Sequence, residues 1–424
     1  MKLFASITIL TVLSILFLGN NVALSQQFIF TKDTLNLGQI DSNLIRAYTN
    51  IKIKDAWQKI EELNPTFIEK IKIMIIDSGV DSSHPEFVNP KVDLGSAPPN
   101  ALFDNDPTGH GTQINGIIGA NNVLGSGGTL PSNSPQMNGI LSGVKNLDYA
   151  LENVFNGGPS LARVLYAIYV STTLKSADIV NISHIFNYPD CNPIQTGALL
   201  ALFSPAFSFH PNTLFITAAG ETTPEISDAS CFLPGALGRQ LSNVINVGGL
   251  DFTGQKRWFG SPSGAAVNIS APAENVYAPA PRGKGDYPAD TKNYDTIFGG
   301  TSASAPMVTG VAAILKAIKP ELTPTEIKNI LVRTADPIQT GEPDKRIGTG
   351  CYSNPNDPVN TGCRLNALKA AQAILAPKLQ ILKSIPIEIN PVSIKLSPDA
   401  SRAYAVNSNP GTSPRQGSGL IVVI

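Results

Sequence analysis

Apolar runs alternate with amphipathic stretches along most of the chain. Residues 161–174, and the stretch that begins at Ile51, carry apolar positions at helical spacing. The runs that we interpret as buried strands ending in turns are residues 71–76, 177–183, 213–220 and 243–249. Because strands alternate with helices, the pattern predicts an α/β fold in which helices cover both faces of a parallel sheet. The ligand crevice of such a sheet lies at the carboxyl ends of its strands.

The N-terminal residues break this pattern. A lysine precedes the apolar run Leu3–Leu18, and small residues follow up to Ser25. The run is shorter than the roughly 18–20 residues of a membrane-spanning helix. Residues 1–25 are therefore predicted to be a cleaved signal peptide, and an uncleaved membrane anchor is the alternative. Residues 26–50 form a polar N-terminal extension.

The pattern of apolar and polar residues changes after the main body of the fold, residues 51–376. The tail, residues 377–424, consists of short alternating segments separated by Pro, Ser and Asn, which predicts β structure. Its stretch IKLSPDASRAYAVN resembles one repeat of the bacterial surface-layer type of β-propeller. The tail is expected to be either the start of such a repeat or a strand pair packed on the main body. Its apolar end, LIVVI, suggests that the protein continues beyond Ile424.

Composition narrows the class of protein. The 424 residues are 42% hydrophobic and 15% charged, with a net charge of -1. This fits a folded body and gives no reason to expect a nucleic-acid or membrane partner. Four cysteines in an exported chain suggest two disulfides among three possible pairings, and we expect Cys191–Cys231 and Cys351–Cys363. Free buried thiols are the alternative, and the spacing does not suggest a zinc site.

Three motifs carry candidate chemistry. In IIDSGVD, Asp77 follows a predicted strand; in GHGTQINGIIGA, His110 starts a predicted helix; in GGTSASAP, Ser302 starts another. The backbone N–H groups at a helix start are unpaired, and the dipole there favours negative charge. Taken singly, the three residues could be a turn acid, a helix cap and an N-cap. Their order along the chain, Asp then His then Ser, is one of the known orders of the serine catalytic triad.

These motifs and their surroundings resemble the subtilisin-like serine protease family over roughly residues 51–376. The resemblance implies a secreted serine endopeptidase that acts on a protein or peptide substrate and requires no cofactor. It implies Ser302 as the nucleophile, His110 as the general base, and Asp77 as the acid that orients the imidazole.

The oxyanion site departs from the family pattern. The resemblance implies two donors, the backbone N–H of Ser302 and an Asn side chain directly after Ala-Ala-Gly, but this chain has Glu221 at the second position. An ionised carboxylate would repel the oxyanion, whereas a protonated one could donate, as in the related sedolisins that work in acid. We therefore expect an acid-preferring enzyme. The alternatives are an inactive pseudoprotease acting as an extracellular binding module, and a donor supplied by Thr222, by Thr223 or by a local shift of the chain.

The substrate-binding strand departs from the family as well. Where family members have Ser-Leu-Gly, this chain has Ser183, His184 and Ile185. The added bulk would reshape the subsites along which a peptide adds as a strand. The small residues expected to line a specificity pocket are Ala218, Ala219 and Gly220.

Two further expectations concern metal binding and maturation. Asp104 and Asp106 lie just before His110 and could bind structural calcium, which is common in the family, although two acids in a polar loop are more often solvated. The roughly 25 residues between Ser25 and Ile51 are too few for a folded pro-domain. Either the protein folds unaided or it is a protease of low activity, and the short segment mildly favours low activity.

Overall fold

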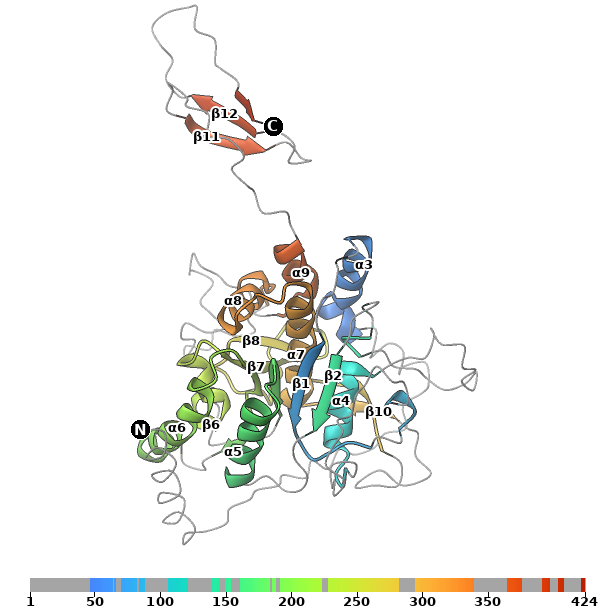
Figure 1. Ribbon diagram of the computed structural model, residues 1–424, viewed down its shortest axis with the longest axis vertical. Helices are drawn as coiled ribbons and strands as arrows, with labels where there is room; N and C mark the ends of the chain where they lie inside the picture. Colours follow the sequence, from blue (N-terminus) through green and yellow to red (C-terminus); the bar gives the residue numbers. More distant parts are fainter. Residues whose placement is uncertain are drawn as a thin grey trace, which may run out of the picture. The chain divides into compact units, whose positions relative to one another are not determined.

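The computed structural model of the protein divides into two compact units, Met1–Ala376 and Pro377–Ile424 (Figure 1). The structure describes residues 46–63, 65, 70–81, 84–87, 106–120, 139–142, 144, 149–153, 161–183, 185–187, 191–222, 228–281, 294–338, 364–375, 391–396, 403–407 and 421–423. The predicted signal peptide and most of the N-terminal extension lie outside these residues.

A six-stranded parallel sheet forms the centre of the first unit. Its strands are β1 (Ile71–Ile76), β2 (Tyr149–Asn153), β3 (Ile179–Ile182), β5 (Leu214–Ala218), β7 (Val244–Leu250) and β8 (Ile269–Pro272). The order across the sheet is β2-β1-β3-β5-β7-β8, and every neighbouring pair is parallel. The four predicted strands correspond to β1, β3, β5 and β7, so the predicted α/β fold with a parallel sheet is confirmed.

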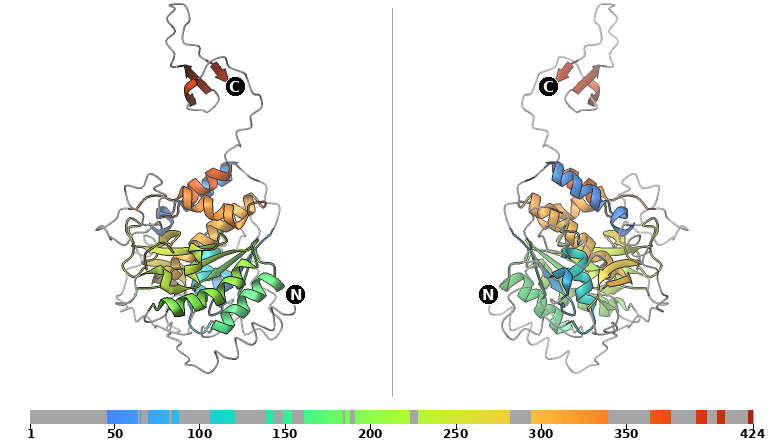
Figure 2. Two further views of the ribbon diagram at one scale, coloured as in Figure 1. Left: turned by 90° about the vertical axis from the view of Figure 1, so that its left-hand side faces the viewer. Right: turned by 90° about the vertical axis from the view of Figure 1, so that its right-hand side faces the viewer.

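Helices cover both faces of this sheet, as Figure 2 shows. Their bounds are α3 (Ile53–Leu63), α4 (His110–Gly119), α5 (Leu161–Tyr169), α6 (Pro193–Ser208), α7 (Thr301–Ile318), α8 (Pro324–Thr334) and α9 (Ala367–Leu375). On β1, Ile73 and Ile75 belong to the core that contains α4 and α7, whereas Met74 and Ile76 belong to the core formed with α5 and α6. Successive side chains of a strand point to opposite faces, so the continuous apolar run of β1 follows from burial on both sides.

Helix α7 lies in the middle of the larger core. Among the residues that the structure describes, it is the one helix long and apolar enough to cross a membrane, and 83% of it is buried inside the protein. Its neighbour α8 begins with a capping box, in which the Thr323 hydroxyl accepts from the Glu326 N–H and the Glu326 carboxylate accepts from the Thr323 N–H. This box fixes the start of α8 directly after the end of α7.

Smaller elements complete the two units. In the first unit, β4 (Phe186–Asn187) pairs with β6 (Phe232–Leu233), and β9 (Val276–Pro279) pairs with β10 (Tyr294–Phe298), both antiparallel. Its short helical segments are η1 (Pro85–Phe87), η3 (Val170–Leu174, a π-helix that extends α5), η4 (Ala229–Cys231) and η5 (Gly235–Arg239). The second unit contains an antiparallel sheet of β11 (Pro391–Leu396), β12 (Ala403–Asn407) and β13 (Ile421–Val423).

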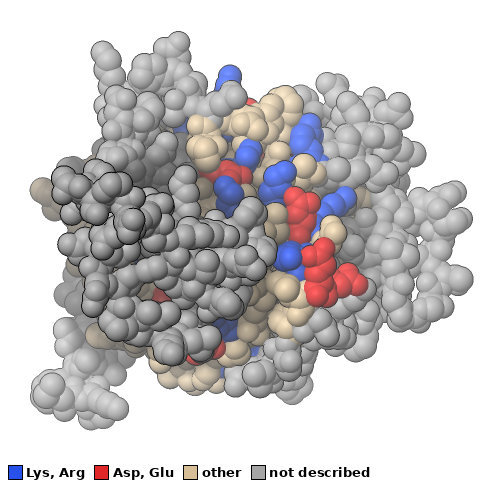
Figure 3. Space-filling model, turned by 90° about the horizontal axis from the view of Figure 1, so that it is seen from above, with Lys and Arg blue, Asp and Glu red and all other residues tan. Residues whose placement is uncertain are grey.

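Surface charge is mixed on the face seen in Figure 3. On the described part of that face, Lys and Arg side chains are interspersed with Asp and Glu. This agrees with the overall net charge of -1.

Candidate active site

The candidate residues gather at the carboxyl edge of the parallel sheet. Asp77 directly follows β1, Ser183 directly follows β3, and Glu221 lies just beyond β5. His110 is the first residue of α4 and Ser302 is the second residue of α7. Helices α4 and α7 pack against each other on the same face of the sheet, so their starts lie near the strand ends.

Asp77 and His110 are in direct contact. The Nδ1 atom of His110 lies 2.7 Å from Oδ1 of Asp77, and Asp77 is fully buried while 28% of the His110 side chain is exposed. The same Asp77 oxygen accepts the backbone N–H of Ser78 at 2.8 Å. Because a carboxylate can only accept, Nδ1 of His110 carries the proton, which leaves the lone pair of Nε2 as the basic site.

Asp106 bonds the residues next to Asp77 and His110. Its Oδ1 accepts from the Ser78 hydroxyl at 2.7 Å and from the Gly109 N–H at 2.8 Å, and its Oδ2 accepts from the Thr112 N–H and hydroxyl, both at 2.7 Å. Asp106 is fully buried. Asp106, one of the two candidate calcium ligands, therefore accepts hydrogen bonds from protein groups at the start of α4. The other candidate, Asp104, lies outside the described residues.

The close approach of α4 to β1 explains the Gly-His-Gly motif. A Cβ atom on Gly111 would lie 2.0 Å from the carbonyl oxygen of Gly79, in the turn that follows Asp77. Only glycine allows this contact. The motif thus brings His110 within hydrogen-bonding distance of Asp77.

Several influences act on the pKa of His110. Burial lowers this pKa, but the charge and hydrogen bond of Asp77, together with the charges of Asp106 and Glu221, raise it above its ordinary value. The ring of Phe298, from β10, packs edge-on against the imidazole with the ring centroids 5.6 Å apart. The His110 imidazole is thus positioned by the Asp77 carboxylate at Nδ1 and by the ring of Phe298 packed against it.

Ser302 is bonded to the end of β3. Its hydroxyl donates to the Ser183 carbonyl at 3.3 Å, and the Ser183 hydroxyl donates to the Ser302 carbonyl at 3.4 Å. The Ser302 hydroxyl is thus within hydrogen-bonding distance of the Ser183 carbonyl. The residue before the nucleophile, Thr301, exchanges hydrogen bonds with Gly220 at the end of β5.

Glu221 lies beside the start of α7. A Cβ atom built on Gly300, which has φ +84°, would lie 2.5 Å from Oε1 of Glu221 and 3.7 Å from the backbone nitrogen of Ser302. Burial raises the pKa of Glu221 from 4.5 to about 7, against the opposing effect of the charge on His110. The carboxyl group therefore lies near the backbone nitrogen of Ser302, and it can carry a proton near neutrality.

The other expected site residues have the following positions. Ala218 and Ala219 are fully buried, and Ile185 is half-buried against the adjoining core. A Cβ atom on Gly220, which has φ +107°, would lie 2.5 Å from the ring of Phe232, so this position requires glycine. His184 lies outside the described residues.

Of the two alternative donors, the structure describes Thr222, whose polar groups are already hydrogen-bonded. The Thr222 hydroxyl donates to the Phe259 carbonyl at 3.1 Å, and its N–H donates to the Gly260 carbonyl at 2.8 Å. Thr223 lies outside the described residues. Within the described part of the chain, no three His, Cys, Asp or Glu side chains cluster as a metal site would require.

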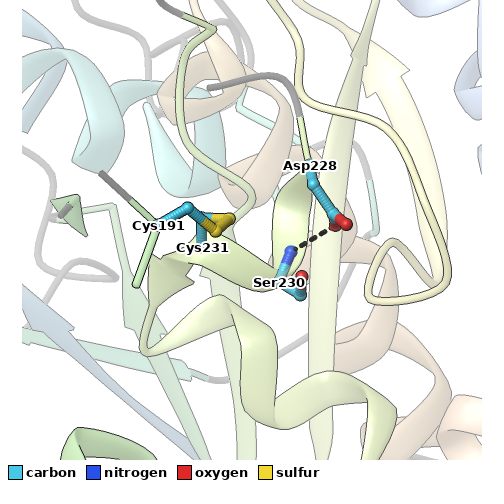
Figure 4. Close-up of a disulfide and its surroundings, with 4 residues drawn as sticks. All are labelled: Cys191, Asp228, Ser230 and Cys231. Carbon is cyan, nitrogen blue, oxygen red and sulfur yellow. Dashed lines mark hydrogen bonds between the residues drawn. A yellow bond between two sulfur atoms is a disulfide. The ribbon is translucent and has the colours of Figure 1, made fainter. Parts of the chain in front are cut away.

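One of the two expected disulfides is present in the structure. Cys191, just before α6, is bonded to Cys231 at the end of η4, with Cα atoms 5.3 Å apart (Figure 4). The Asp228 carboxylate caps η4 by accepting the Ser230 N–H at 2.9 Å. Cys351 and Cys363 lie outside the described residues.

Two buried residues of the site, Asn181 and Thr309, could not be identified from the sequence. Asn181, in the middle of β3, is fully buried and bonded to Ser183 and to Thr309 of α7. The available signal was a lone amide inside the β-branched run ADIVNIS. A buried polar residue in a central strand requires hydrogen-bond partners, but the sequence does not identify them.

A buried aspartate bonded to a histidine, with a serine at the start of a nearby helix, is the arrangement of a serine hydrolase. Comparison with known proteins identifies the family. The chain matches the subtilase family over residues 69–350 and belongs to it. Subtilases are serine endopeptidases, so the chain is a serine-type endopeptidase by family, with proteins or peptides as substrates.

Individual relatives are distant. The chain is 26% identical to subtilisin DY of Bacillus licheniformis over 62% of its own length and 83% of that protein. It is 27% identical to subtilisin E of Bacillus subtilis over 62% of its length and 60% of that protein, and 39% identical to mycosin-5 of Mycobacterium tuberculosis over 27% of its length and 19% of that protein. A crystal structure of MycP1 without its N-terminal propeptide aligns with 69% of this chain and 90% of that chain at 22% identity and a TM-score of 0.49.

Proposed function

We propose that the protein is an exported serine endopeptidase in which Asp77, His110 and Ser302 act as the catalytic triad. The observation that carries the proposal is the 2.7 Å contact between His110 Nδ1 and the buried Asp77 carboxylate. Export is supported by the apolar run near the N-terminus and by the Cys191–Cys231 disulfide, since disulfides persist in oxidising compartments.

The reaction begins when Ser302 Oγ attacks the carbonyl carbon of the scissile peptide. Nε2 of His110 takes the hydroxyl proton, and Asp77 stabilises the imidazolium that forms. For this step the Ser302 hydroxyl turns away from the Ser183 carbonyl, to which it donates in the resting protein. The imidazolium then protonates the leaving amine, and water hydrolyses the acyl-enzyme ester with His110 again acting as the base.

Glu221 supplies the second oxyanion donor in this proposal. Its carboxyl group lies against Gly300, next to the backbone nitrogen of Ser302, which is the first donor. Only the protonated carboxyl has an O–H to donate, and burial raises the pKa of Glu221 to about 7. Thr222 is a weaker candidate because its hydroxyl already donates to the Phe259 carbonyl.

This chemistry requires opposite protonation states at two neighbouring groups. His110 must be neutral to accept a proton, while Glu221 must be protonated to donate one. Burial and Asp77 have the largest effects on the pKa of His110, and the negative charge of Glu221 also raises this pKa. Burial raises the pKa of Glu221, and the positive charge of His110 lowers it. The two groups therefore titrate as a coupled pair. Activity should therefore rise as His110 loses its proton and fall as Glu221 ionises, with an optimum below the alkaline range.

An inactive pseudoprotease that serves as a binding module is less well supported. Loss of function would leave no reason for the buried Asp77 to remain bonded to His110 or for Asp106 to brace the start of α4. The departure at Glu221 has an explanation in acid–base chemistry and does not require an inactive enzyme.

The test is hydrolysis of a mixed peptide library by the purified protein from about pH 3 to pH 9, the range over which His and a raised carboxyl titrate. A Ser302→Ala variant is the matched control. We expect cleavage that this variant lacks and that declines as the pH rises past neutrality. Cleavage that persists in the Ser302→Ala variant, or no cleavage by the unsubstituted protein at any pH, would contradict the proposal.

A further inference from the structure

A line of buried polar groups runs from the interior of α7 to the proposed nucleophile. The Thr309 hydroxyl lies 2.8 Å from Oδ1 of Asn181, Nδ2 of Asn181 lies 3.1 Å from the Ser183 hydroxyl, and that hydroxyl lies 3.4 Å from the Ser302 carbonyl. Thr309 and Asn181 are fully buried, and Ser183 is 3% exposed. These groups cross an interface between β3 and α7 that is otherwise apolar.

Helix and strand geometry places the four residues face to face. Thr309 lies two turns beyond Ser302 on the same side of α7, because an α-helix repeats its faces about every seven residues. Asn181 and Ser183 are alternate residues and so point to the same side of β3. The network is therefore a contact between one helix face and one strand face.

A proline explains why the Ser302 carbonyl needs an outside donor. In an α-helix the carbonyl of residue 302 would accept from the N–H of residue 306, but that residue is Pro306, inside α7, and it has no N–H. A carbonyl left without a donor in a protein interior is costly. The Ser183 hydroxyl occupies this position.

The donors and acceptors are used in one consistent direction. The Thr309 hydroxyl faces two acceptors, the Asn181 oxygen at 2.8 Å and the Ala305 carbonyl at 3.0 Å, and the contact to Asn181 is the shorter. The Asn181 amide donates to the Ser183 hydroxyl, and Ser183 donates its own proton to the Ser302 carbonyl. Removing the first donor frees the Asn181 amide to rotate, which in turn loosens the bond between Ser183 and Ser302. Each link is neutral, so the network has no charge of its own to titrate.

We infer that Asn181 and Thr309 are positioning residues for Ser302, which they orient through Ser183. The inference rests on the proposed function, because it concerns the geometry of the same nucleophile. The network fixes the position of the Ser302 carbonyl. Because the carbonyl is part of the peptide plane that contains the Cα atom, it also restricts the directions in which Oγ can point. Attack by a nucleophile is sensitive to displacements of about 1 Å.

The experiment compares Thr309→Val, which removes the hydroxyl at nearly constant shape, with Thr309→Ser, which keeps it. Peptide hydrolysis gives kcat and KM, and phosphonylation by a fluorophosphonate probe measures the reactivity of Ser302 without peptide binding. We expect Thr309→Val to lower kcat and the labelling rate by about 10-fold or more, with KM little changed. Thr309→Ser should restore both rates, and neither variant should shift the pH profile.

Thr213→Val is the matched control for the loss of a buried threonine hydroxyl. Thr213 is 5% exposed and donates to the Ala177 carbonyl at 2.9 Å. Both residues lie at the amino ends of β3 and β5, whereas Ser302 lies near the carboxyl ends of the strands. This variant should lose stability but keep kcat. If Thr309→Val does not fold, Ser183→Ala replaces it, since it removes the last donor of the same network, the hydroxyl bonded to the Ser302 carbonyl.

The outcomes separate the two proposals. Unchanged kcat and labelling in Thr309→Val, or equal losses in Thr309→Val and Thr309→Ser, overturn the positioning role and leave the protease intact. A loss confined to KM also overturns it, because that would indicate substrate binding. Failure of the unsubstituted protein to cleave peptides or to be labelled removes the proposed function and this inference with it.

Discussion

Thr301 and Gly220 exchange two hydrogen bonds between the start of α7 and the end of β5. The Thr301 hydroxyl donates to the Gly220 carbonyl at 2.8 Å and accepts from the Gly220 N–H at 3.1 Å. Thr301 is 1% exposed. Since these residues immediately precede Ser302 and Glu221, the exchange fixes the separation between the proposed nucleophile and the proposed oxyanion donor.

Replacing Thr301 with valine should weaken both stability and catalysis. The Thr301→Val variant leaves the N–H and carbonyl of Gly220 buried without partners, which costs about 1–3 kcal/mol in the free energy of unfolding. We expect a lower urea midpoint and a lower kcat, because Glu221 is no longer held beside Ser302. Thr301→Ser keeps the hydroxyl and should recover most of both. Equal behaviour of the two variants would show that the hydroxyl does not hold the site together.

Replacing Glu221 with glutamine should change the shape of the pH profile. Glutamine keeps an N–H donor at nearly the same position and does not ionise, so the decline of kcat/KM above neutrality should disappear in Glu221→Gln. The rising limb at low pH should stay nearly unchanged, because burial raises the pKa of Glu221 to about 7 and its carboxyl group is therefore protonated and uncharged in that range. The measurement is kcat/KM for one peptide from about pH 4 to 9.

A contrary result is also informative for this variant. If Glu221→Gln retains the decline above neutrality, another group titrates there and Glu221 is not the donor. If it loses activity at every pH while Glu221→Asn regains it, the amide reaches the oxyanion site only with the shorter side chain.

The chemistry of the site could largely be predicted from local sequence. Asp77, His110 and Ser302 each follow or begin an element with strong periodicity, and the motifs around them include glycines whose role the structure explains, such as Gly111 against Gly79. Glu221 was also recognised, because it directly follows the end of a clear strand. Parallel strands bring such positions to one edge of the sheet.

The supporting interactions could not be predicted in the same way. Thr309 and Asn181 are 128 residues apart in the chain, and their hydrogen bond depends on the rotation of α7 against β3. The sequence around Asp106 suggests a polar loop that could hold calcium, yet the Asp106 carboxylate is buried and bonded to Ser78 and Thr112. Hydrophobic periodicity identifies elements, but it does not determine which side chains meet between them.

Removing the Cys191–Cys231 disulfide should destabilise the first unit. The bond closes a segment of 40 residues that contains α6 and β5, and cross-links of this length typically contribute about 2–4 kcal/mol. A Cys191→Ala/Cys231→Ala double variant should therefore show a clearly lower urea midpoint. A variant is preferable to a reductant, which would also act on Cys351 and Cys363. An unchanged midpoint would mean that the bond does not constrain the unfolded chain.

Asp336 should stabilise the protein until the solution becomes strongly acidic. Its carboxylate accepts from Lys369 Nζ at 2.7 Å, from Asn366 Nδ2 at 2.9 Å and from Arg364 Nη2 at 3.3 Å, which joins the end of α8 to α9. Burial raises the pKa of Asp336, but the hydrogen bonds from Lys369, Asn366 and Arg364 and the charge of Lys369 lower it below its ordinary value overall. The folded protein therefore binds this proton less readily than the unfolded chain does.

The sign of the resulting pH dependence is fixed. A carboxyl group with a lowered pKa in the folded state contributes its full stabilisation above the ordinary value of 3.8, and loses it as the pH falls through the folded value. At pH 7 and 5, Asp336→Asn should unfold about 1.5–3 kcal/mol more easily than the unsubstituted protein, because hydrogen bonds to a charged group are lost. At about pH 2 the difference should shrink toward zero. Urea denaturation at these three pH values provides the measurement.

A difference that stays constant down to the lowest pH would mean that the charge of Asp336 does not anchor α9. A difference that has already vanished at pH 5 would mean that the network fails in the range where the protonated Glu221 is expected to support catalysis.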